Sequence, residues 1–321
     1  MLTLPDHWVW DFWTAHDGER HHLFFLKAPR SLGDPDLRHW NVRIGHAVST
    51  DLVDWEVLDD AFGPAEGGLD DYTTWTGSIV RDGDLWWMFY TGTSIAERGL
   101  VQRIFAATSP DLHTWTRVGQ PVVEADARWY ETPTDYDWFD VACRDPWVLR
   151  DPDGDGWHML FTARRHEGPA DERGVIGHAV SEDLRSWEVR APLPTSGPGF
   201  GQLEVAHPVA DEGAHAMVFS CRTPELSAQR RAAGQVGGVW IAPASGPLGP
   251  VALDRAALLL PPDLYAGKVV RTAEGSLVAL GFRYEDGAGG FAGVIEDPVP
   301  LGSLAGWETT ADPLGASLSL P

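Results

Sequence analysis

The chain has 321 residues, of which 43% are hydrophobic and 16 are tryptophan, enough to bury a large core without a metal or a disulfide framework. Its 47 acidic and 24 basic residues give a formal net charge of −23, which repels phosphate backbones and anionic lipids. We therefore expect neither nucleic acid nor a membrane as a partner, and a neutral ligand fits better.

The N-terminus and the cysteines indicate where the protein works. Residues 1–8 contain neither a basic region nor an apolar run, so we expect no secretory signal and a cytoplasmic location. No stretch of about 18 apolar residues follows, which disfavours a membrane-spanning helix. Cys143 and Cys221 have no metal-binding spacing, and we expect buried thiols. The oligomeric state is left open.

Strand-like runs follow one another along almost the whole chain. They are bounded by Gly, Asp and Pro clusters typical of hairpin turns, and they comprise residues 23–26, 79–81, 85–90, 147–149, 157–161, 215–221, 238–242 and 277–282. Helical periodicity is nearly absent, although residues 225–234 are compatible with a short helical turn. Residues 63–73 and 125–140 are predicted long loops over one face, where binding commonly resides.

One sequence pattern repeats. Residues 44–56, Ile-Gly-His-Ala-Val-Ser-Thr-Asp-Leu-Val-Asp-Trp-Glu, return almost unchanged at 176–188, and a looser copy covers 104–115, so Trp55, Trp115 and Trp187 stand 60 and 72 residues apart. Such a period is typical of four-stranded sheets that bury their faces only when stacked. At this spacing the chain holds about five copies. The sequence predicts an all-β, single-domain, five-bladed β-propeller over residues 1–321, with the last 15 or so as a loose tail.

In a propeller the innermost strand of each blade faces the central axis. Polar segments containing Trp, Asp, Glu or Tyr recur at one-blade intervals, with Asp11, Trp75, Asp145, Glu204 and Tyr265 separated by 64, 70, 59 and 61 residues. We expect them to meet in one funnel.

Three of these five residues are carboxylic acids: Asp11, Asp145 and Glu204. Two acids that flank a glycosidic bond are the minimum machinery for its cleavage. A third acid beside an arginine can bind sugar hydroxyls and stabilise a cationic transition state. The pattern favours an enzyme acting on a small saccharide, and the alternative is a structural propeller in which Asp11 and Asp145 only end strands.

A metal site is suggested at one turn only. Asp151-x-Asp153-x-Asp155-Gly156 resembles the first half of a calcium loop, but Thr162 stands where a bidentate Glu is required. We therefore expect a hairpin turn there, with no metal or cofactor, and calcium near Asp151 is left open.

The ordered segments resemble the five-bladed propeller glycosidases of clan J. These are the β-fructosidases and invertases of glycoside hydrolase family 32 and the levansucrase-type fructosyltransferases of family 68. Trp10-Asp11 is similar to the levansucrase nucleophile segment, Trp75-Thr76-Gly77-Ser78 to the shared Trp-Ser-Gly-Ser segment, and Arg144-Asp145-Pro146 to the Arg-Asp-Pro segment. Residues 45–55 resemble an invertase Gly-His-Ala-x-Ser-x-Asp-Leu-x-x-Trp segment, and residues 263–266 a late invertase motif.

The resemblance implies roles for these residues. Asp11 would be the nucleophile, Glu204 the general acid/base, and Asp145 with Arg144 a clamp on the fructosyl hydroxyls. The other implied substrate-binding residues are Trp10, Trp75, Thr76, Ser78, His207 and Tyr265, although for His207 a structural hydrogen bond is favoured over a catalytic role. A retaining β-fructofuranosidase would need Glu204 protonated and Asp11 ionised, and crowding by acids and aromatic rings is expected to raise the pKa of Glu204.

The departures from the family pattern keep alternatives open. The invertase Trp-x-Asn-Asp-Pro-Asn-Gly pattern is absent around Asp11, Val205-Ala206 replaces the Cys-Pro after the acid/base Glu, and the C-terminal β-sandwich is missing. The substrate would be sucrose or a short fructo-oligosaccharide. The alternatives are fructosyl transfer, an inverting arabinofuranosidase-like propeller, which would hold its acids further apart, and a non-catalytic sugar-binding propeller.

Overall fold

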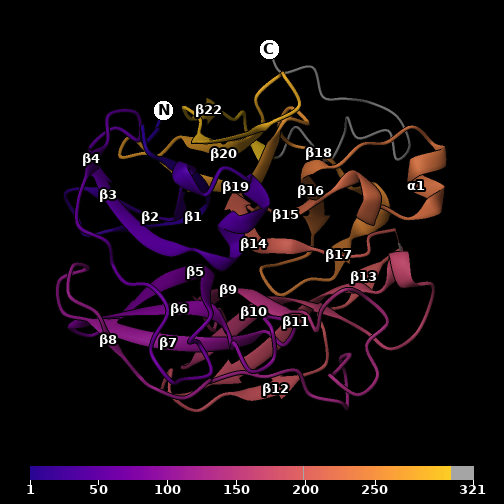
Figure 1. Cartoon of the computed structure of the whole chain (residues 1–321). Coiled ribbons are helices and arrows are strands. Elements are labelled where there is room, and N and C mark those ends of the chain that lie inside the picture. Colours follow the sequence, from indigo (N-terminus) through magenta and orange to yellow (C-terminus); the bar gives the residue numbers. More distant parts are fainter. Residues whose placement is uncertain (198, 305–321) are drawn as a thin grey trace.

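The computed structural model describes residues 1–197 and 199–304, which form five β-sheets around a common axis (Figure 1). The fold is thus the predicted all-β, five-bladed propeller. The predicted C-terminal tail lies outside the described residues. No helix in the described part of the chain is long and apolar enough to cross a membrane.

The first three blades are four-stranded and follow the chain from the axis outward. Blade 1 contains β1 (His7–His16), β2 (His21–Pro29), β3 (Arg43–Ser49) and β4 (Glu56–Val57). Blade 2 contains β5 (Thr73–Asp82), β6 (Leu85–Thr93), β7 (Arg103–Ser109) and β8 (Thr116–Arg117). Blade 3 contains β9 (Cys143–Arg150), β10 (Trp157–Arg164), β11 (Gly174–Ser181) and β12 (Glu188–Arg190).

The last two blades are less regular. Blade 4 contains β14 (Glu204–Asp211), β15 (Ala214–Cys221) and β16 (Gly238–Ala244), with β13 (Thr195–Ser196), β17 (Val251–Ala252) and β18 (Ala257–Leu258) at its outer edge. Blade 5 contains β19 (Leu264–Arg271), β20 (Leu277–Glu285), β21 (Phe291–Ile295) and β22 (Val299–Pro300). The strands β1, β5, β9, β14 and β19 gather at the centre of Figure 1.

The described helices are short and lie between strands. They are the 3-10 helices η1 (Arg30–Leu32), η2 (Pro35–Trp40), η3 (Ala170–Glu172), η4 (Thr223–Glu225) and η5 (Leu253–Arg255), and the α-helix α1 (Ala228–Ala232). The helical turn predicted within 225–234 is therefore confirmed. The two predicted loops also lack regular structure before β5 and before β9.

The repeated Ser-x-Asp-Leu pattern forms the same turn in three blades. Leu52, Leu112 and Leu184 all adopt a left-handed backbone, with φ of 65°, 65° and 62°, which is uncommon for a residue other than glycine. In blade 1 the Leu52 N–H donates to Ser49 Oγ at 2.9 Å, and the Val53 and Asp54 N–H groups donate to Asp51 Oδ1. These side-chain acceptors hold the turn, and each leucine is buried.

The repeated tryptophan joins neighbouring blades. Trp115 of blade 2 packs edge-on against Phe24 of blade 1, with ring centroids 5.7 Å apart. Trp187 of blade 3 packs in the same way against Phe89 of blade 2, at 5.5 Å. The period of the sequence is thus the period of the contacts between blades.

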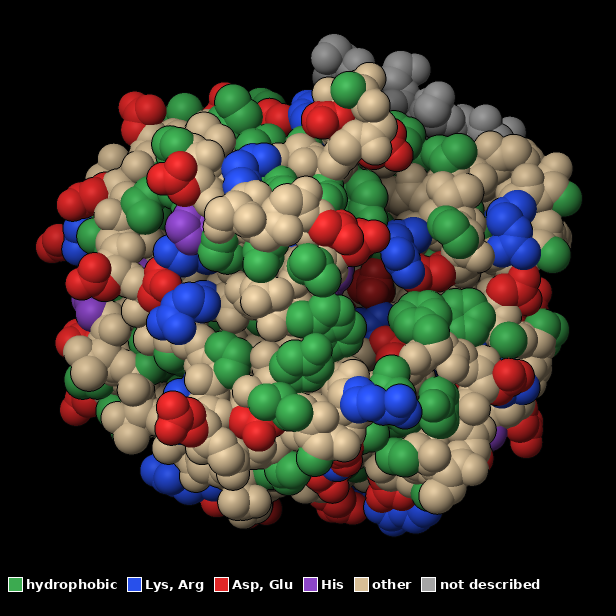
Figure 2. All heavy atoms as spheres, in the orientation of Figure 1, with side chains coloured by type: hydrophobic (Ala, Val, Ile, Leu, Met, Phe, Trp, Pro, Cys, Tyr) green, Lys and Arg blue, Asp and Glu red, His purple; other side chains and the backbone are tan. Residues whose placement is uncertain are grey.

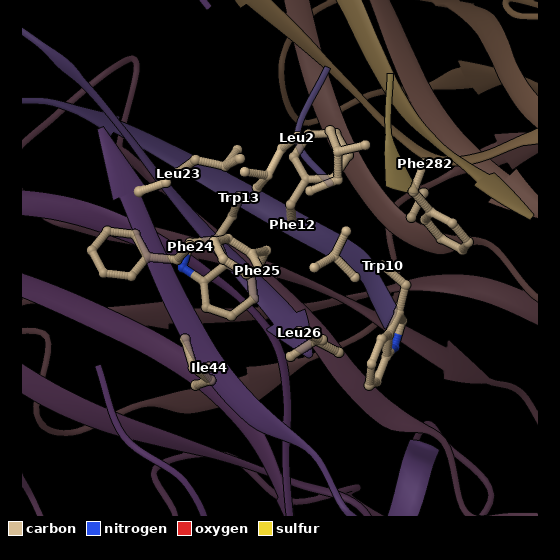
Figure 3. Packing of buried hydrophobic residues seen from close by; sticks show 14 of the residues in the cluster. Leu2, Trp10, Phe12, Trp13, Leu23, Phe24, Phe25, Leu26, Ile44 and Phe282 are labelled. Carbon is tan, nitrogen blue, oxygen red and sulfur yellow. The ribbon is translucent and has the colours of Figure 1, made fainter. Parts of the chain in front are cut away.

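The ring closes through the N-terminus. The Leu2 N–H donates to Ile295 O at 2.8 Å and Leu2 O accepts from the Ile295 N–H at 3.0 Å, so the first residues bond to the last blade. Figure 3 shows Leu2, from the N-terminus, and Phe282, from blade 5, near Trp10 and Phe12 of β1. All four belong to one buried hydrophobic cluster. Closure fixes the inner strands relative to one another and therefore fixes the cavity between them.

Two minor predictions are settled by the fold. Cys143 and Cys221 are buried free thiols, as expected. The Asp151–Gly156 segment is the hairpin between β9 and β10, in which the Asp151 N–H donates to Gly156 O at 3.0 Å and Asp151 Oδ1 accepts from the Asp153 N–H. The described residues hold no group of three or more His, Cys, Asp or Glu side chains arranged to bind a metal.

Candidate active site

Every inner strand is interrupted by a β-bulge at the same level. The pairing register shifts between Trp10 and Phe12, between Trp75 and Gly77, opposite Leu160 and Thr162 in β9, between Glu204 and His207, and between Tyr265 and Lys268. A bulge bends its strand and re-aims the side chains beside it. Three bulge residues, Asp145, Val205 and Ala266, have positive φ values of 56°, 51° and 48°.

The bulges correct the register expected from the sequence. Asp11, Thr76, Asp145, Val205 and Ala266 occupy equivalent positions, whereas Trp10, Trp75, Arg144, Glu204 and Tyr265 stand one residue earlier. The five predicted markers therefore mix two neighbouring positions. In blades 1 to 4 residues of both positions line the same cavity, because a bulge re-aims consecutive side chains.

The bulges surround a cavity of about 300 Å³, within the size range of small-molecule sites. Its lining includes Asp11, Asp145 and Glu204, and also Trp10, Trp75, Thr76, Arg144 and Tyr265. Figure 2 shows a hollow near the middle of the face that is turned to the viewer, in which acidic and basic side chains lie between hydrophobic ones. The structure thus brings together the three predicted acids and five of the seven other predicted site residues.

Asp11 contacts the neighbouring blade. Its Oδ2 accepts a hydrogen bond of 2.6 Å from Thr76 Oγ1. Burial raises the pKa of Asp11, and the charge of Glu204 raises it further, while the Thr76 hydroxyl acts in the opposite direction. The hydrogen bond therefore favours the ionised carboxylate.

Asp145 is held in place from two sides. Its Oδ2 accepts from Thr162 Oγ1 at 2.9 Å and from the Val205 N–H at 3.2 Å, and Arg144 Nε lies 3.6 Å from the same atom. Burial raises the pKa of Asp145 to about 7 despite the opposing charge of Arg144. The side chain is fixed by donors on β10 and β14, so it cannot swing out of the cavity without losing both bonds.

Glu204 is bound on both carboxylate oxygens. Oε1 accepts from Arg144 Nη2 at 2.7 Å, and Oε2 accepts from the Tyr265 hydroxyl. Burial raises the pKa of Glu204, but Arg144 and Arg222 outweigh it, so the net pKa lies below its usual value. The same burial, together with Glu204, raises the pKa of Tyr265 and keeps that residue a donor.

These pKa directions contradict the expectation from the sequence. Crowding by acids and aromatic rings predicts a raised pKa for Glu204, and the mechanism that the resemblance implies needs Asp11 ionised. In the structure the pKa of Glu204 is lowered, and those of Asp11 and Asp145 are raised. The physical reason is that two cations, Arg144 and Arg222, act on Glu204, whereas the sequence analysis placed only Arg144 beside it.

Two predicted site residues lie outside the cavity lining. Ser78 Oγ accepts from the Val148 N–H at 3.2 Å and so links β5 to β9. His207 Nε2 accepts from the Val269 N–H at 3.1 Å, its Nδ1 lies 3.2 Å from Val205 O, and its ring packs on Trp147. Both side chains are buried and bonded to the backbone of a neighbouring strand, a structural role rather than direct substrate binding.

Residues outside the repeat complete the wall. The 3-10 helix η2, inserted between β2 and β3, contributes Arg38, His39 and Trp40. Burial, reinforced by nearby Arg38, lowers the pKa of His39 to about 3, so its ring is neutral. The loop before β9 contributes Phe139, whose side chain is exposed, and Asp140. The predicted loop at 125–140 includes Phe139 and Asp140, whereas no sequence pattern indicated the residues of η2.

A polar network supports Arg144. Its Nη1 donates to Gln102 Oε1 at 3.0 Å and lies 3.3 Å from Asp140 Oδ2, which also accepts from Gln102 Nε2 at 2.7 Å. Burial raises the pKa of Asp140, against the charge of Arg144. On the other side of Glu204, Arg222 donates to the buried Glu225 at 3.0 Å. The cavity lining therefore includes four acids and three arginines, and Arg144 lies within 4.0 Å of the carboxylates of Asp140, Asp145 and Glu204.

Comparisons with known proteins agree with this architecture. A family profile described as "Glycosyl hydrolases family 32 N-terminal domain" matches residues 13–233. A "Probable sucrose-6-phosphate hydrolase" from Psychromonas ingrahamii is 32% identical over 176 residues, which are 54% of this chain and 28% of that protein. A "Fructan 6-exohydrolase" from Triticum aestivum is 29% identical over 211 residues, which are 62% of this chain and 32% of that protein. The match thus spans about a third or less of either relative.

A solved structure has the same fold. An inulosucrase from Halalkalicoccus jeotgali bound to kestose superposes with a TM-score of 0.72 at 24% identity, covering 90% of this chain and 79% of that one. At this identity the likeness concerns the propeller alone.

Proposed function

The chain belongs to the glycosyl hydrolases of family 32, and on that premise we propose that it cleaves β-fructofuranosides by a retaining mechanism. One observation carries the proposal: Asp11, Asp145 and Glu204, which are far apart in the sequence, line a single cavity of about 300 Å³. The proposed substrates are sucrose and short fructo-oligosaccharides, and the cytoplasmic location stays a prediction.

The reaction proceeds in two steps. Asp11 attacks the anomeric carbon of the fructosyl unit while Glu204 gives its proton to the departing glycosidic oxygen, which leaves a fructosyl ester on Asp11. Water then attacks the same carbon, Glu204 takes the proton of that water, and the Asp11 carboxylate is released. Asp145, fixed by Thr162 and Val205, accepts hydrogen bonds from sugar hydroxyls close to the developing positive charge.

Proton placement decides when the site is active. Interacting acids titrate as a group. Burial raises the pKa of Asp145 and Asp11, while Arg144 and Arg222 lower that of Glu204, so the proton is favoured on Asp145 or Asp11. The proposed mechanism needs that proton on Glu204 once the substrate is bound. A glycosidic oxygen that accepts a hydrogen bond from the neutral form of Glu204 favours that form over the carboxylate.

The walls support a sugar as ligand. Trp10, Trp75 and Tyr265 line the cavity beside the acids and offer apolar faces with polar edges. The Trp75 Nε1–H donates to His39 O at 2.9 Å, which fixes the indole against the helix η2. A furanose ring bound between these faces would have its hydroxyls within reach of Asp145 and Arg144.

The test is the variant Asp11→Asn, which we expect to abolish turnover of sucrose and kestose while thermal unfolding is unchanged. Asp84→Asn, in the exposed hairpin between β5 and β6, is the matched control. Unchanged activity of Asp11→Asn would remove the proposal. The substrate panel also includes sucrose-6-phosphate, because the relative from Psychromonas ingrahamii is named a probable sucrose-6-phosphate hydrolase. Arabinofuranosides are included to test the alternative of an arabinofuranosidase-like propeller.

Three alternatives are separated by the same assay. Products longer than the substrate in concentrated sucrose would indicate fructosyl transfer, and inversion of the product anomer would indicate an inverting furanosidase. Binding of a saccharide without any product would indicate a sugar-binding propeller.

A further inference from the structure

Lys268 is an unusual residue for this chain. The sequence contains two lysines, Lys27 and Lys268, among its 24 basic residues. Lys27 pairs with Asp60 at 2.6 Å. Lys268, on the inner strand β19, is only 4% exposed, and among the described residues no carboxylate oxygen lies within 4.0 Å of its Nζ. A buried cation without a direct counter-ion is costly, so its presence asks for an explanation.

The Nζ of Lys268 binds the bulge that follows Glu204. It donates to Val205 O at 3.1 Å, and it lies 5.3 Å from the centroid of the Trp147 ring. Because His207 Nε2 accepts from the Val269 N–H, the His207 proton is on Nδ1, which donates to the same Val205 oxygen at 3.2 Å. Two donors therefore converge on one carbonyl.

That carbonyl belongs to a strained residue. Val205 has φ of 51°, a left-handed conformation that is unfavourable for a β-branched side chain. Its own N–H donates to Asp145 Oδ2 at 3.2 Å, and its neighbour in the chain is Glu204. The orientation of this single residue thus sets the positions of both acids, and the two donors on its carbonyl hold the orientation.

Lys268 also carries charge toward the acids. Burial lowers its pKa to about 8, and Asp145 and Asp11 act in the opposite direction. It is therefore mainly protonated at neutral pH. The titratable groups that face it from the packed strands are Asp11 on β1, Asp145 on β9 and His207 on β14, and the pKa of His207 is lowered so that its ring is neutral.

We propose that Lys268 is a positioning residue, which clamps the Val205 bulge through its carbonyl and places one positive charge close to Asp11 and Asp145. The inference deepens the proposed fructosidase function and rests on it. Neither the clamp nor the charge requires contact with the substrate, in keeping with the absence of Lys268 from the cavity lining.

The first test is kinetic. Lys268→Met removes the charge and the donor at similar volume, and we expect kcat to fall about ten- to a hundredfold, with a smaller change in KM. The acid limb of the kcat/KM profile should move to higher pH, because Asp11 loses a cation that favours its ionised form. Lys268→Gln, which retains a donor without the charge, should recover part of kcat and leave the acid limb displaced.

Lys27→Met is the control, because Lys27 pairs with Asp60 and does not line the cavity. Circular dichroism and thermal unfolding establish that each variant is folded. A folded Lys268→Met enzyme with unchanged kcat and an unchanged acid limb would overturn the proposal.

The second test does not depend on turnover. Protein labelled with ¹³C at the lysine Cε should give two resonances, one for each lysine, and Lys27→Met identifies them. We expect the Lys268 resonance to titrate with a midpoint near pH 8. In Asp11→Asn this midpoint should move to lower pH, because the variant removes a neighbouring anion. A Lys268 titration that Asp11→Asn does not move would contradict the charge coupling, whatever the outcome of the activity assay.

Discussion

Thr76 Oγ1 on blade 2 donates a 2.6 Å hydrogen bond to Asp11 Oδ2 on blade 1. The bond joins the proposed nucleophile to the equivalent position of the next inner strand. Loss of the hydroxyl in Thr76→Val should remove about 1.5–3 kcal/mol of stabilisation from the ionised carboxylate. The pKa of Asp11 should then rise, and the acid limb of kcat/KM should move to higher pH with it.

The control for this prediction is Thr76→Ser, which keeps the hydroxyl and should keep the acid limb near its original pH. A profile of Thr76→Val that matches the unchanged enzyme would show that the hydrogen bond does not govern the ionisation of Asp11. The pH profiles are measured with sucrose under conditions where each variant is folded.

The charge of Asp140 should affect the pKa of Glu204, the proposed proton donor. Its negative charge, near Arg144, acts on Glu204 as a like charge and favours the protonated form of that residue. Replacement by Asn removes this repulsion, so the pKa of Glu204 falls and the alkaline limb of kcat/KM should move to lower pH by about one unit or less. Movement of the limb in the opposite direction would contradict the assigned charge network.

The fold was predictable because the repeat records contacts between blades. The Ser-x-Asp-Leu turn and the closing Trp appear in the sequence with the period of the stacking, as Trp115 on Phe24 and Trp187 on Phe89 demonstrate. The three acids were predictable for the same reason, because residues that recur once per blade on the inner strands lie close together at the axis.

The remainder of the site has no period. Arg38, His39 and Trp40 belong to one inserted helix, and Asp140 ends an irregular loop, so neither leaves a signal in the other blades. The one-residue offset between Asp11 and Glu204 arises from the bulges, which are set by backbone conformation. The lowered pKa of Glu204 depends on Arg144 and, in addition, on Arg222, whose approach is a property of the folded ring alone.

Acid pH should weaken the fold through two histidine pairs. His22 Nδ1 and His46 Nε2 lie 2.9 Å apart in blade 1, and His158 Nδ1 and His178 Nε2 lie 2.8 Å apart in blade 3. Burial, with the partner histidine adding to it, lowers the pKa of His46 to about 3 and that of His178 to about 4.

Because the unfolded chain takes up these protons near pH 6.5 and the folded chain does not, stability falls as the pH drops below that value. Between pH 7 and pH 5 we expect a loss of about 2 kcal/mol for His46. His46→Gln should flatten the pH dependence of the unfolding free energy, measured in urea. An unchanged slope in His46→Gln would show that this histidine titrates normally in the fold.

A buried ion pair should hold the loop that carries Phe139 and Asp140. Glu131, 1% exposed, accepts from Arg164 Nε at 2.9 Å and from Arg173 Nη1 at 2.9 Å, and Arg164 also lies 4.0 Å from the centroid of the Trp138 ring. Arg164→Met leaves a buried carboxylate with one partner, so we expect a loss of about 3 kcal/mol in the free energy of unfolding. Displacement of the loop should also raise KM.

The matched control is Arg190→Met, whose exposed pair with Glu188 at 2.8 Å should contribute less than about 1 kcal/mol. Adding Glu131→Gln to Arg164→Met removes the uncompensated charge and should restore part of the lost stability. Equal losses for Arg164→Met and Arg190→Met in urea titrations would mean that the loop is held by its packing, and that the charges at Glu131 contribute nothing specific.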